Sequence, residues 1–373
     1  MHFVHLITGH EFGAQQQQAL RLAQALNDRE SHNTLICEPG SVVAIAAQAQ
    51  GLEVILAPDQ ARSAPGRIMQ VRRVIRELDP ALVHIHRGDS SSMPGAISAW
   101  LAGVPAVLST DFPARRNPVL RKFSYGLFER ILTRSTRLAE SLIERGLPAQ
   151  KHCLVRTGVD AEDCRPAWTL DKFQREFDLN DSNIAIGMIA ELEDGQGHRD
   201  LFKALPGIYA AYSRTRIILI GEGRLENQFR KIVESQGLES VVSFAGRRPD
   251  LSSFLGHFDM LIHLSPDTQH AIHLIEAQAA GVPVVAFDQG AVRESVADGH
   301  VGNLVANRDP VELTAAIKRL MYRPEKRKKL GKQAQAWVRE EFAVTAMVES
   351  YIAAYRNVLQ PRTDRDTRSC EAS

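Results

Sequence analysis

The chain has 373 residues, which is too long for one ordinary hydrophobic core and suits two domains. Its 45 Lys and Arg residues against 44 Asp and Glu leave a formal net charge of +1, so nothing global argues for nucleic acid as a partner. Four cysteines without a CxxC spacing fit a reducing compartment rather than a disulfide framework, and no stretch approaches the ~20 apolar residues of a membrane span.

Short apolar runs alternate with segments of helical period, which is the pattern of parallel sheets with crossover helices. In the first half, helices are expected between the apolar runs, for example at Gln15–Leu26 and Arg67–Leu78. The runs themselves predict strands at Phe3–Ile7, Thr34–Cys37, Glu53–Leu56, Leu82–His86, Ala106–Ser109 and Cys153–Arg156.

The same pattern starts again in the second half of the chain. Its apolar runs predict strands at Ile184–Ile189, Arg216–Ile220, Val241–Ala245, Met260–Leu264 and Pro283–Phe287. Its helical segments are Arg199–Leu205, Arg224–Gln236, Pro310–Met321 and Lys326–Glu341. The polar stretch between the halves predicts a linker at 166–182, which separates a domain at 1–165 from one at 183–360. The charged tail at 361–373 is expected to be disordered.

The stretch Asp259–Glu294 carries the clearest sign of a binding site. A buried strand is followed by a polar loop at Ser265–Gln269 and by a helix at Ile272–Ala280 that holds one carboxylate, Glu276. Free N–H groups in the first turn of a helix bind anions such as a diphosphate. A carboxylate about one turn further in can accept hydrogen bonds from ribose hydroxyls. The stretch therefore predicts a nucleotide site.

Six groups of motifs follow one another in a meaningful order: TGHEFGAQ at 8–15, LVHIHR at 82–87, RTGVDAEDCRP at 156–166, LIGEGR at 219–224, FAGR at 244–247, and EAQAAGVPVVAF at 276–287 with GAVRE at 290–294. Together they resemble the motifs of retaining glycosyltransferases of the GT-B architecture, in particular glycosyltransferase family 4 (group 1). The resemblance implies two doubly wound, Rossmann-like α/β domains that face each other across a cleft. The N-terminal domain would be the acceptor side, and the C-terminal domain would bind a nucleotide sugar.

The resemblance also assigns roles to residues of this sequence. Glu276 would bind the donor ribose, and backbone N–H groups near Ile272 and His273 would hold the diphosphate. The turn at Gly246–Arg247 would lie near the base, with Gly221 in the neighbouring glycine turn of the donor site. Gly13 would let the first loop approach the phosphates, since a Cβ there would clash. Such enzymes usually need no metal or other cofactor, because helix N-termini and cations offset the charge of the leaving diphosphate.

Several positions depart from the family pattern. Thr268 stands where the family has a second glutamate, and His270 and Ala271 stand where it has Phe-Gly. The arginine and lysine that neutralise the phosphates fall on Glu191 and Gln196, and a histidine that often follows a first-domain strand falls near Thr110–Asp111. Losing two cations should weaken diphosphate binding by several kcal/mol unless others replace them. The candidate replacements are His270, His273, His198, Arg199 and Arg247.

Two histidine pairs allow more than one interpretation. His84 and His86 alternate along one predicted strand and therefore share a face. His86, at the strand's end, either lines the cleft with a catalytic role or belongs to the core, whereas His84 is expected in the core. His270 and His273 lie three residues apart on a helix, but no third ligand is evident, so the cleft or the surface is favoured over a metal site.

The segment at 115–145 is rich in arginine and contains interleaved aromatic residues. It is either a solvated helix face or a contact with an anionic membrane surface or a lipid-linked acceptor.

These features predict a cytoplasmic glycosyltransferase that also contacts the inner face of the membrane. It would move a sugar, with retention, from a nucleotide-diphosphate donor to a glycan or lipid-linked acceptor of the lipopolysaccharide, capsule or cell-envelope type. His86 and Thr268 are the candidate catalytic residues, with Gln196 and His270 near the sugar and phosphates. One alternative is a GT-B-fold protein with weakened catalysis that acts as a nucleotide-binding or assembly partner. Another is an epimerase of the same architecture.

Overall fold

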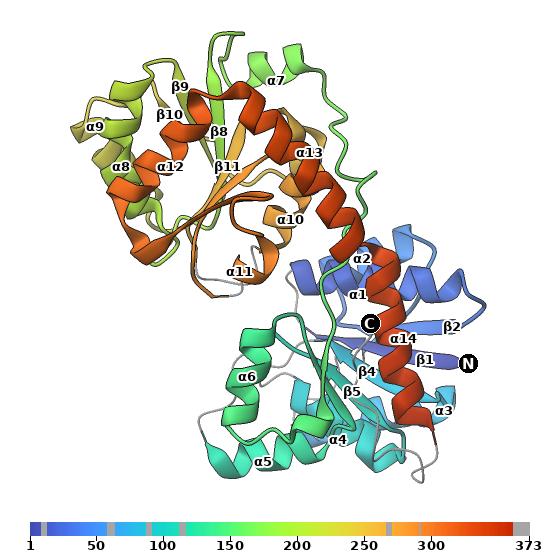
Figure 1. Ribbon diagram of the computed structural model, residues 1–373. Coiled ribbons are helices and arrows are strands. Elements are labelled where there is room, and N and C mark those ends of the chain that lie inside the picture. The colour runs from blue at the N-terminus through green and yellow to red at the C-terminus, as the bar shows by residue number, and fades with distance from the viewer. Residues whose placement is uncertain are drawn as a thin grey trace. The chain divides into compact units, whose positions relative to one another are not determined.

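The protein is described by a computed structural model that covers residues 1–8, 13–57, 64–86, 92–111, 117–265, 271–290 and 292–360 (Figure 1). The chain divides into two compact units. The first consists of Met1–Gly158 together with the C-terminal residues from Val344 onward, and the second is Val159–Ala343. Within the described ranges, no helix is long and apolar enough to cross a membrane.

The first unit contains a seven-stranded parallel sheet of order β3-β2-β1-β4-β5-β6-β7. Its strands are β1 (His2–Ile7), β2 (His32–Cys37), β3 (Glu53–Leu56), β4 (Leu82–His86), β5 (Ala106–Ser109), β6 (Arg130–Thr133) and β7 (His152–Leu154). Its helices are α1 (Ala14–Asn27), α2 (Val42–Ala49), α3 (Ala64–Leu78), α4 (Ser92–Ala102), α5 (Pro118–Gly126), α6 (Thr136–Glu144) and α14 (Val344–Leu359).

Both faces of this sheet are buried. Val4 and Ile85 pack on one face with Ala96 and Ala99 of α4. On the other face, Phe3 and Leu82 join residues of α1 and α14 in a second cluster. A parallel sheet covered on both sides needs strands that are mostly apolar. This is why most of its strands could be predicted from short apolar runs in the sequence.

The second unit contains a six-stranded parallel sheet of order β10-β9-β8-β11-β12-β13. Its strands are β8 (Ile184–Ile189), β9 (Thr215–Ile220), β10 (Val242–Phe244), β11 (Met260–His263), β12 (Val284–Phe287) and β13 (Gly302–Val305). Its helices are α7 (Leu170–Glu176), α8 (His198–Ala211), α9 (Glu226–Ser235), α10 (Ala271–Ala279), α11 (Val292–Ser295), α12 (Pro310–Met321) and α13 (Pro324–Glu341). Residues of α8 and α12 contribute to the core cluster on one face, and residues of α10 to the cluster on the other.

The predicted domain boundaries were wrong at two places. The prediction assigned 344–360 to the second domain, but α14 belongs to the first unit, and Figure 1 shows it in red beside the blue elements. The reason is burial, because Met347, Tyr351 and Tyr355 of α14 lie in one core cluster with Phe3 and Leu82.

The predicted linker at 166–182 is also part of the second unit. It contains α7, whose Phe173 is buried in the core of that unit with Phe254 and Phe258. The backbone N–H of Trp168 donates to the carbonyl of Ser253 at 2.8 Å, which holds the start of this segment against the same core.

The arginine-rich segment at 115–145 is not one amphipathic helix. Its described part, from residue 117, forms α5, β6 and α6 in turn, and Phe128 is buried in the first core. Of its apolar residues, Val119 and Phe123 on α5 are exposed, 75% and 53% respectively, and Ile143 on α6 is 38% exposed. Among the described residues, the most exposed apolar side chains of this segment therefore lie on α5.

Candidate functional site

The second sheet reverses its winding between β8 and β11. From β8 the chain proceeds outward through β9 and β10, and it then returns to place β11 on the other side of β8. In open α/β sheets, ligands bind beyond the carboxyl ends of the strands at such a switch point. The loops after β8 and β9 and the first turn of α10 all lie at this edge, which makes it the candidate donor site.

Glycines allow the loops at this edge to pack closely. Gly197, with a φ of +90°, sits so near the end of β11 that a Cβ would lie 2.3 Å from the Cβ of Leu264. A Cβ on Gly221 would lie 2.1 Å from the carbonyl oxygen of Ala190. The N–H of Gly221 donates to the carbonyl of Gly246 at 2.9 Å, which brings the Gly246–Arg247 turn to the same edge. Gly221 and the Gly246–Arg247 turn therefore lie together at this edge, and their roles at a donor site stay a prediction.

Helix α10 carries the predicted ribose carboxylate. The His273 Nδ1–H donates to Glu276 Oε2 at 2.9 Å, and the Glu276 side chain is only 15% exposed, so the imidazole fixes the direction of the carboxylate. Ile272 is buried, and the backbone of this first turn is the part available to a ligand. The Gln278 side-chain amide donates to the carbonyl of Ser295 at 2.8 Å and holds α10 against α11. The predicted site residues Thr268 and His270 lie outside the described residues.

Most arginines named at this edge are neutralised by the chain's own carboxylates. Arg224 Nε donates to Glu193 at 2.6 Å, and its backbone N–H donates to the same carboxylate at 3.0 Å. These hydrogen bonds hold the pKa of Glu193 below its ordinary value. Arg199 lies 3.3 Å from Asp194, and Arg293 donates to Asp288 at 2.8 Å.

Arg247 differs from these arginines. It is exposed, and it makes no ion pair or hydrogen bond with the described part of the chain. Of the candidate cations in the described ranges, Arg247 is therefore the one best placed to meet an anion.

Gln196 and His198 flank Gly197 in the loop that enters α8. Gln196 Oε1 is buried and has no hydrogen-bond partner among the described residues. His198 is 1% exposed, its ring stacks on Phe229 with centroids 5.0 Å apart, and neither ring nitrogen has a partner in the described ranges. Burial lowers the pKa of His198 to about 4. The ring is therefore neutral at pH 7, and the prediction of His198 as a replacement cation was wrong.

The first unit holds a small pocket at the carboxyl ends of β4 to β6. Its volume is about 10 Å³, which is room for about one water molecule, and it is partly open to solvent. The two charged lining residues pair with each other, since Arg134 Nε donates to Asp111 Oδ1 at 2.8 Å and a second guanidinium nitrogen donates to Oδ2. The lining residues are Gln15, Gln18, His86, Ser109, Thr110, Asp111, Leu132, Thr133, Arg134, Val155 and Tyr351.

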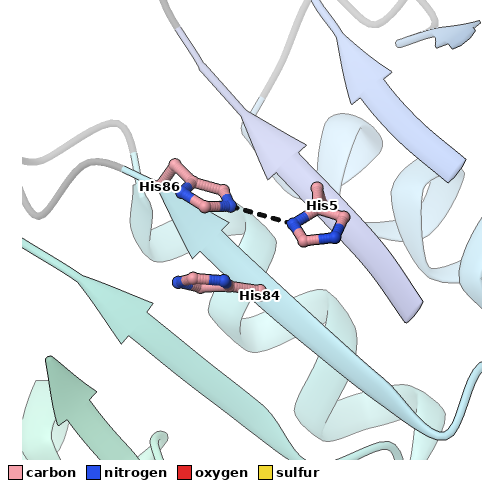
Figure 2. A group of neighbouring side chains, drawn as sticks. All are labelled: His5, His84 and His86. Carbon is pink, nitrogen blue, oxygen red and sulfur yellow. Dashed lines mark hydrogen bonds between the residues drawn. The ribbon is translucent and has the colours of Figure 1, made fainter. Parts of the chain in front are cut away.

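His86 belongs both to this pocket and to a cluster of buried histidines (Figure 2). His86 Nε2 lies 3.0 Å from His5 Nδ1, and His5 Nε2 lies 3.2 Å from Asn33 Oδ1. His84 Nδ1 lies 2.6 Å from the Tyr355 hydroxyl, and its Nε2 lies 2.7 Å from Ser109 Oγ. His84 is therefore a core residue with polar partners, as expected, whereas His86 connects the core to the pocket.

Three histidines with ligand atoms within 4.8 Å of one another could hold a metal ion. Lone pairs on imidazole lie in the ring plane, so the three planes would have to converge on one point. The rings of His84 and His86 instead lie one above the other, with centroids 3.8 Å apart and planes inclined by 38°. Both nitrogens of His5 and of His84 are also engaged by protein partners. The arrangement fits a hydrogen-bonded cluster better than a metal centre.

Gly13 is the N-cap residue of α1, and the described structure gives no steric reason for a glycine at this position. Its φ is −109°, and a Cβ would approach nothing in the described structure more closely than Gln16 Oε1 at 3.4 Å. The predicted reason for Gly13, close approach to a ligand, stays a prediction.

Sequence reasoning did not find Arg134, Tyr351 or His5. Arg134 lies in the arginine-rich segment predicted to be either a solvated helix face or a contact with a membrane surface or lipid-linked acceptor, and nothing local indicates that it reaches Asp111, 23 positions earlier. His5 carried a usable signal, since it alternates with apolar residues in a strand just as His84 and His86 do.

Two family descriptions match the chain: Glycosyltransferase Family 4 over residues 15–163 and Glycosyl transferases group 1 over residues 171–337. The putative glycosyltransferase EpsD of Bacillus subtilis is 24% identical over 180 residues, 48% of this chain and 47% of that protein. A phosphatidyl-myo-inositol mannosyltransferase of Mycolicibacterium smegmatis is 24% identical over 322 residues, 82% of this chain and 80% of that protein. For EpsD and several other curated relatives, the chain spans about half of the relative's length.

Solved structures resemble the whole chain. A glycosyltransferase from Rickettsia africae has a TM-score of 0.85 at 16% identity, over 96% of this chain and 98% of that one. HepE of Anabaena, solved with UDP-glucose, has a TM-score of 0.82 at 18% identity, over 94% and 98%. WaaG, a glycosyltransferase involved in lipopolysaccharide biosynthesis, has a TM-score of 0.69 at 14% identity, over 94% and 98%. At these identities the likeness establishes the fold, which is the GT-B architecture of two Rossmann-like units.

Proposed function

Because the chain belongs to the group 1 glycosyltransferases of family 4, we propose that it transfers a sugar from a nucleotide-diphosphate donor to a glycan or lipid-linked acceptor. The observation that carries the proposal is the pairing of His273 with Glu276 in helix α10, beside the switch point of the second sheet. A carboxylate held in one direction can accept two hydrogen bonds from ribose hydroxyls, while the first turn of the helix donates to the diphosphate.

In this proposal, catalysis rests on positioning and charge stabilisation, and the sugar is transferred with retention. The first turn of α10 and the exposed Arg247 would stabilise the diphosphate as it leaves, in place of the cations lost at Glu191 and Gln196. Thr268 is proposed near the donor sugar, and Gly13 allows the first loop to approach the phosphates. No metal or other cofactor is needed for this scheme.

An acceptor of the cell envelope, such as lipopolysaccharide or capsule, is proposed on two grounds. WaaG, which shares the fold, is involved in lipopolysaccharide biosynthesis. In addition, helix α5 exposes Val119 and Phe123 next to Lys122, an arrangement that suits an anionic membrane surface. We therefore propose a cytoplasmic protein with peripheral contact to the inner face of the membrane.

Binding and transfer are tested separately. Calorimetry with UDP, GDP and ADP should identify one nucleotide that binds, and Glu276→Gln should weaken its binding about 10- to 100-fold, because hydrogen bonds to a charged group are lost. Glu239→Gln is the matched control, since Glu239 is exposed and lies just before β10, at the opposite edge of the sheet. Unchanged binding in Glu276→Gln would refute the proposed donor site.

The second candidate function is nucleotide binding without transfer, as an assembly partner. It is favoured by one observation, the acidic Glu191 and neutral Gln196 at positions where the family has cations. To separate the two functions, labelled sugar donors that carry the nucleotide found to bind are incubated with envelope glycans and lipid-linked acceptors. Transfer supports the enzyme, and tight binding without transfer or hydrolysis supports the partner role.

A further inference from the structure

The turn between α12 and α13, drawn in orange to red in Figure 1, gathers positive charge on the surface of the second unit. Residues 319–332 contain seven Lys and Arg residues and one Glu, in a chain whose formal net charge is only +1. Five of these cations are exposed, and the ring of Tyr322 between them is 60% exposed. We call the following six residues the basic surface: Arg319, Tyr322, Arg323, Lys328, Lys329 and Lys332.

Arg327 holds this turn in place. Its guanidinium donates to the carbonyl oxygens of Leu320 and Met321 at 2.8 and 2.9 Å and to Asp259 Oδ1 at 3.0 Å. Asp259 directly precedes β11, so the turn lies at the amino ends of the strands. The candidate donor site lies at their carboxyl ends. A partner bound to the basic surface would therefore leave the donor site open.

The charges of the basic surface are hardly neutralised within the chain. Lys328 lies 3.8 Å from Glu325, but both side chains are largely exposed, and such a pair contributes little. The side chains of Lys329 and Lys332 make no ion pair or hydrogen bond with the described part of the chain, and neither does that of Arg323. The basic surface can therefore offer its charges to a partner.

Another exposed helix of the same unit neutralises its cations at helical spacing. In α9, Arg230 donates to Glu226, four residues earlier, at 2.7 Å. In α13, the residue four positions after Lys328 is again a lysine, Lys332. Like charges at this spacing repel and destabilise a helix. Anions from outside the chain would remove this repulsion.

The composition of the basic surface favours lipid headgroups as these anions. Clusters of four to eight Lys and Arg residues on a helix are typical of contacts with anionic bilayers. The Tyr322 hydroxyl donates to the carbonyl oxygen of Ala211 at 2.7 Å, which holds the exposed ring at the surface, and tyrosine is enriched where membrane meets water. Residues 319–332 contain no second aromatic ring, whereas single-stranded nucleic acids are bound by several rings that stack on successive bases.

We propose that the basic surface binds the headgroups of an anionic phospholipid bilayer by charge attraction, without insertion of apolar side chains. This contact differs from the one proposed for α5, because it belongs to the second unit and depends on cations rather than on Val119 and Phe123. It is reversible, since charge attraction of this kind is weak and is screened by salt. Its use in reaching a lipid-linked acceptor rests on the proposed function, whereas the binding itself does not.

Cosedimentation of the full-length protein with vesicles tests the proposal. The parent should bind vesicles with about one third phosphatidylglycerol in ~0.1 M NaCl, and it should bind less in ~0.5 M NaCl or to phosphatidylcholine alone. Combining Lys329→Gln with Lys332→Gln should weaken binding about 25-fold, because each lysine near an anionic leaflet contributes about fivefold. Combining Lys329→Arg with Lys332→Arg keeps the charge and should preserve binding.

The matched control combines Lys203→Gln with Lys231→Gln. It removes the same charge from exposed positions on α8 and α9 and should bind almost as the parent does. Near-UV circular dichroism verifies that each variant is folded.

Three results would overturn the proposal. The first is equal binding of the Lys329→Gln, Lys332→Gln protein and the control. The second is binding that is insensitive to salt and abolished by Phe123→Ser, which would assign the contact to α5. The third is tighter binding of a single-stranded oligonucleotide than of vesicles at the same salt concentration, lost in the Lys329→Gln, Lys332→Gln protein.

Failure of the proposal can be distinguished from failure of the proposed function. If transfer is absent with every donor while vesicle binding still depends on Lys329 and Lys332, the proposed transfer fails and the basic surface keeps its assignment. If transfer to a water-soluble acceptor occurs and the parent does not bind anionic vesicles, the assignment of the basic surface fails and the proposed transfer stands.

Discussion

The ring of His198, whose nitrogens have no partner in the described ranges, should make the second unit sensitive to acid. The folded state holds His198 neutral, with its pKa lowered from 6.5 to about 4 by burial, while the unfolded chain takes up a proton near pH 6.5. A lowered folded-state pKa means that the unfolded state binds more protons between these values. The stabilisation is therefore complete above pH 6.5 and is lost as the pH falls toward 4. The loss amounts to about 2 kcal/mol between pH 8 and pH 5.

Replacing His198 with leucine, of similar volume, should remove this loss and also stabilise the protein at pH 8. The leucine removes the buried polar nitrogens, which should stabilise the folded state by about 1–3 kcal/mol. The lost aromatic contact with Phe229 should cost about 1 kcal/mol. Between pH 8 and pH 5, His198→Leu should lose about 2 kcal/mol less of its free energy of unfolding than the parent does.

Tryptophan fluorescence can report this for the second unit alone. The chain has three tryptophans, and two of them, Trp168 and Trp337, pack in the second core. A Trp100→Phe background therefore restricts the signal in urea titrations at pH 8 and pH 5 to that unit. His300→Asn, at an exposed histidine of the same unit, should behave like the parent. An equal loss of stability in His198→Leu and the parent on acidification would refute the reasoning.

Three further substitutions test the packing that positions the two sites. Gly197→Ala should destabilise the second unit in urea titration by more than about 2 kcal/mol, because its Cβ would meet Leu264 at 2.3 Å. Gly237→Ala should cost only about 1 kcal/mol, since its φ is also positive but nothing lies within 4 Å, and equal costs would contradict the steric argument. Arg134→Leu should lower first-unit stability by about 3–5 kcal/mol by leaving the Asp111 carboxylate buried without its partner. Adding Asp111→Leu should recover most of that loss in thermal unfolding, and no recovery would show that the pair is not coupled. Tyr355→Phe should cost about 1–3 kcal/mol by removing the hydroxyl 2.6 Å from His84 Nδ1, and a neutral result would mean that this bond adds nothing.

The sequence predicted most strands, because a strand buried on both faces is mostly apolar along its length. Strands β6 and β13 were not predicted, because neither forms a clear apolar run in the sequence. The four residues of β6 lie within an arginine-rich segment, and β13 contains Gly302 and Asn303 among its four residues. The pattern of α14 shows that it has a buried face but not which sheet covers that face. That partner depends on contacts between residues more than 200 positions apart, such as His84 and Tyr355.

The two candidate sites differed in how well they could be predicted. At the candidate donor site, Glu276 and the glycine turns could be proposed from the sequence because they lie in short continuous motifs. The pocket of the first unit is assembled from the ends of separate strands and from α14, so no local pattern reports it. Asp111 and Arg134 are joined only because β5 and β6 are neighbours in the sheet.

The return of α14 to the first unit makes that unit discontinuous along the chain, with the second unit inserted into it. During synthesis, the second unit is complete once residue 343 has emerged, whereas the first still lacks α14, which covers one face of its sheet together with α1. The second unit can therefore fold first, and the first must wait for α14. Until then, His84 lacks its hydrogen bond with the Tyr355 hydroxyl, and the histidine cluster of the incomplete first unit is not covered by α14.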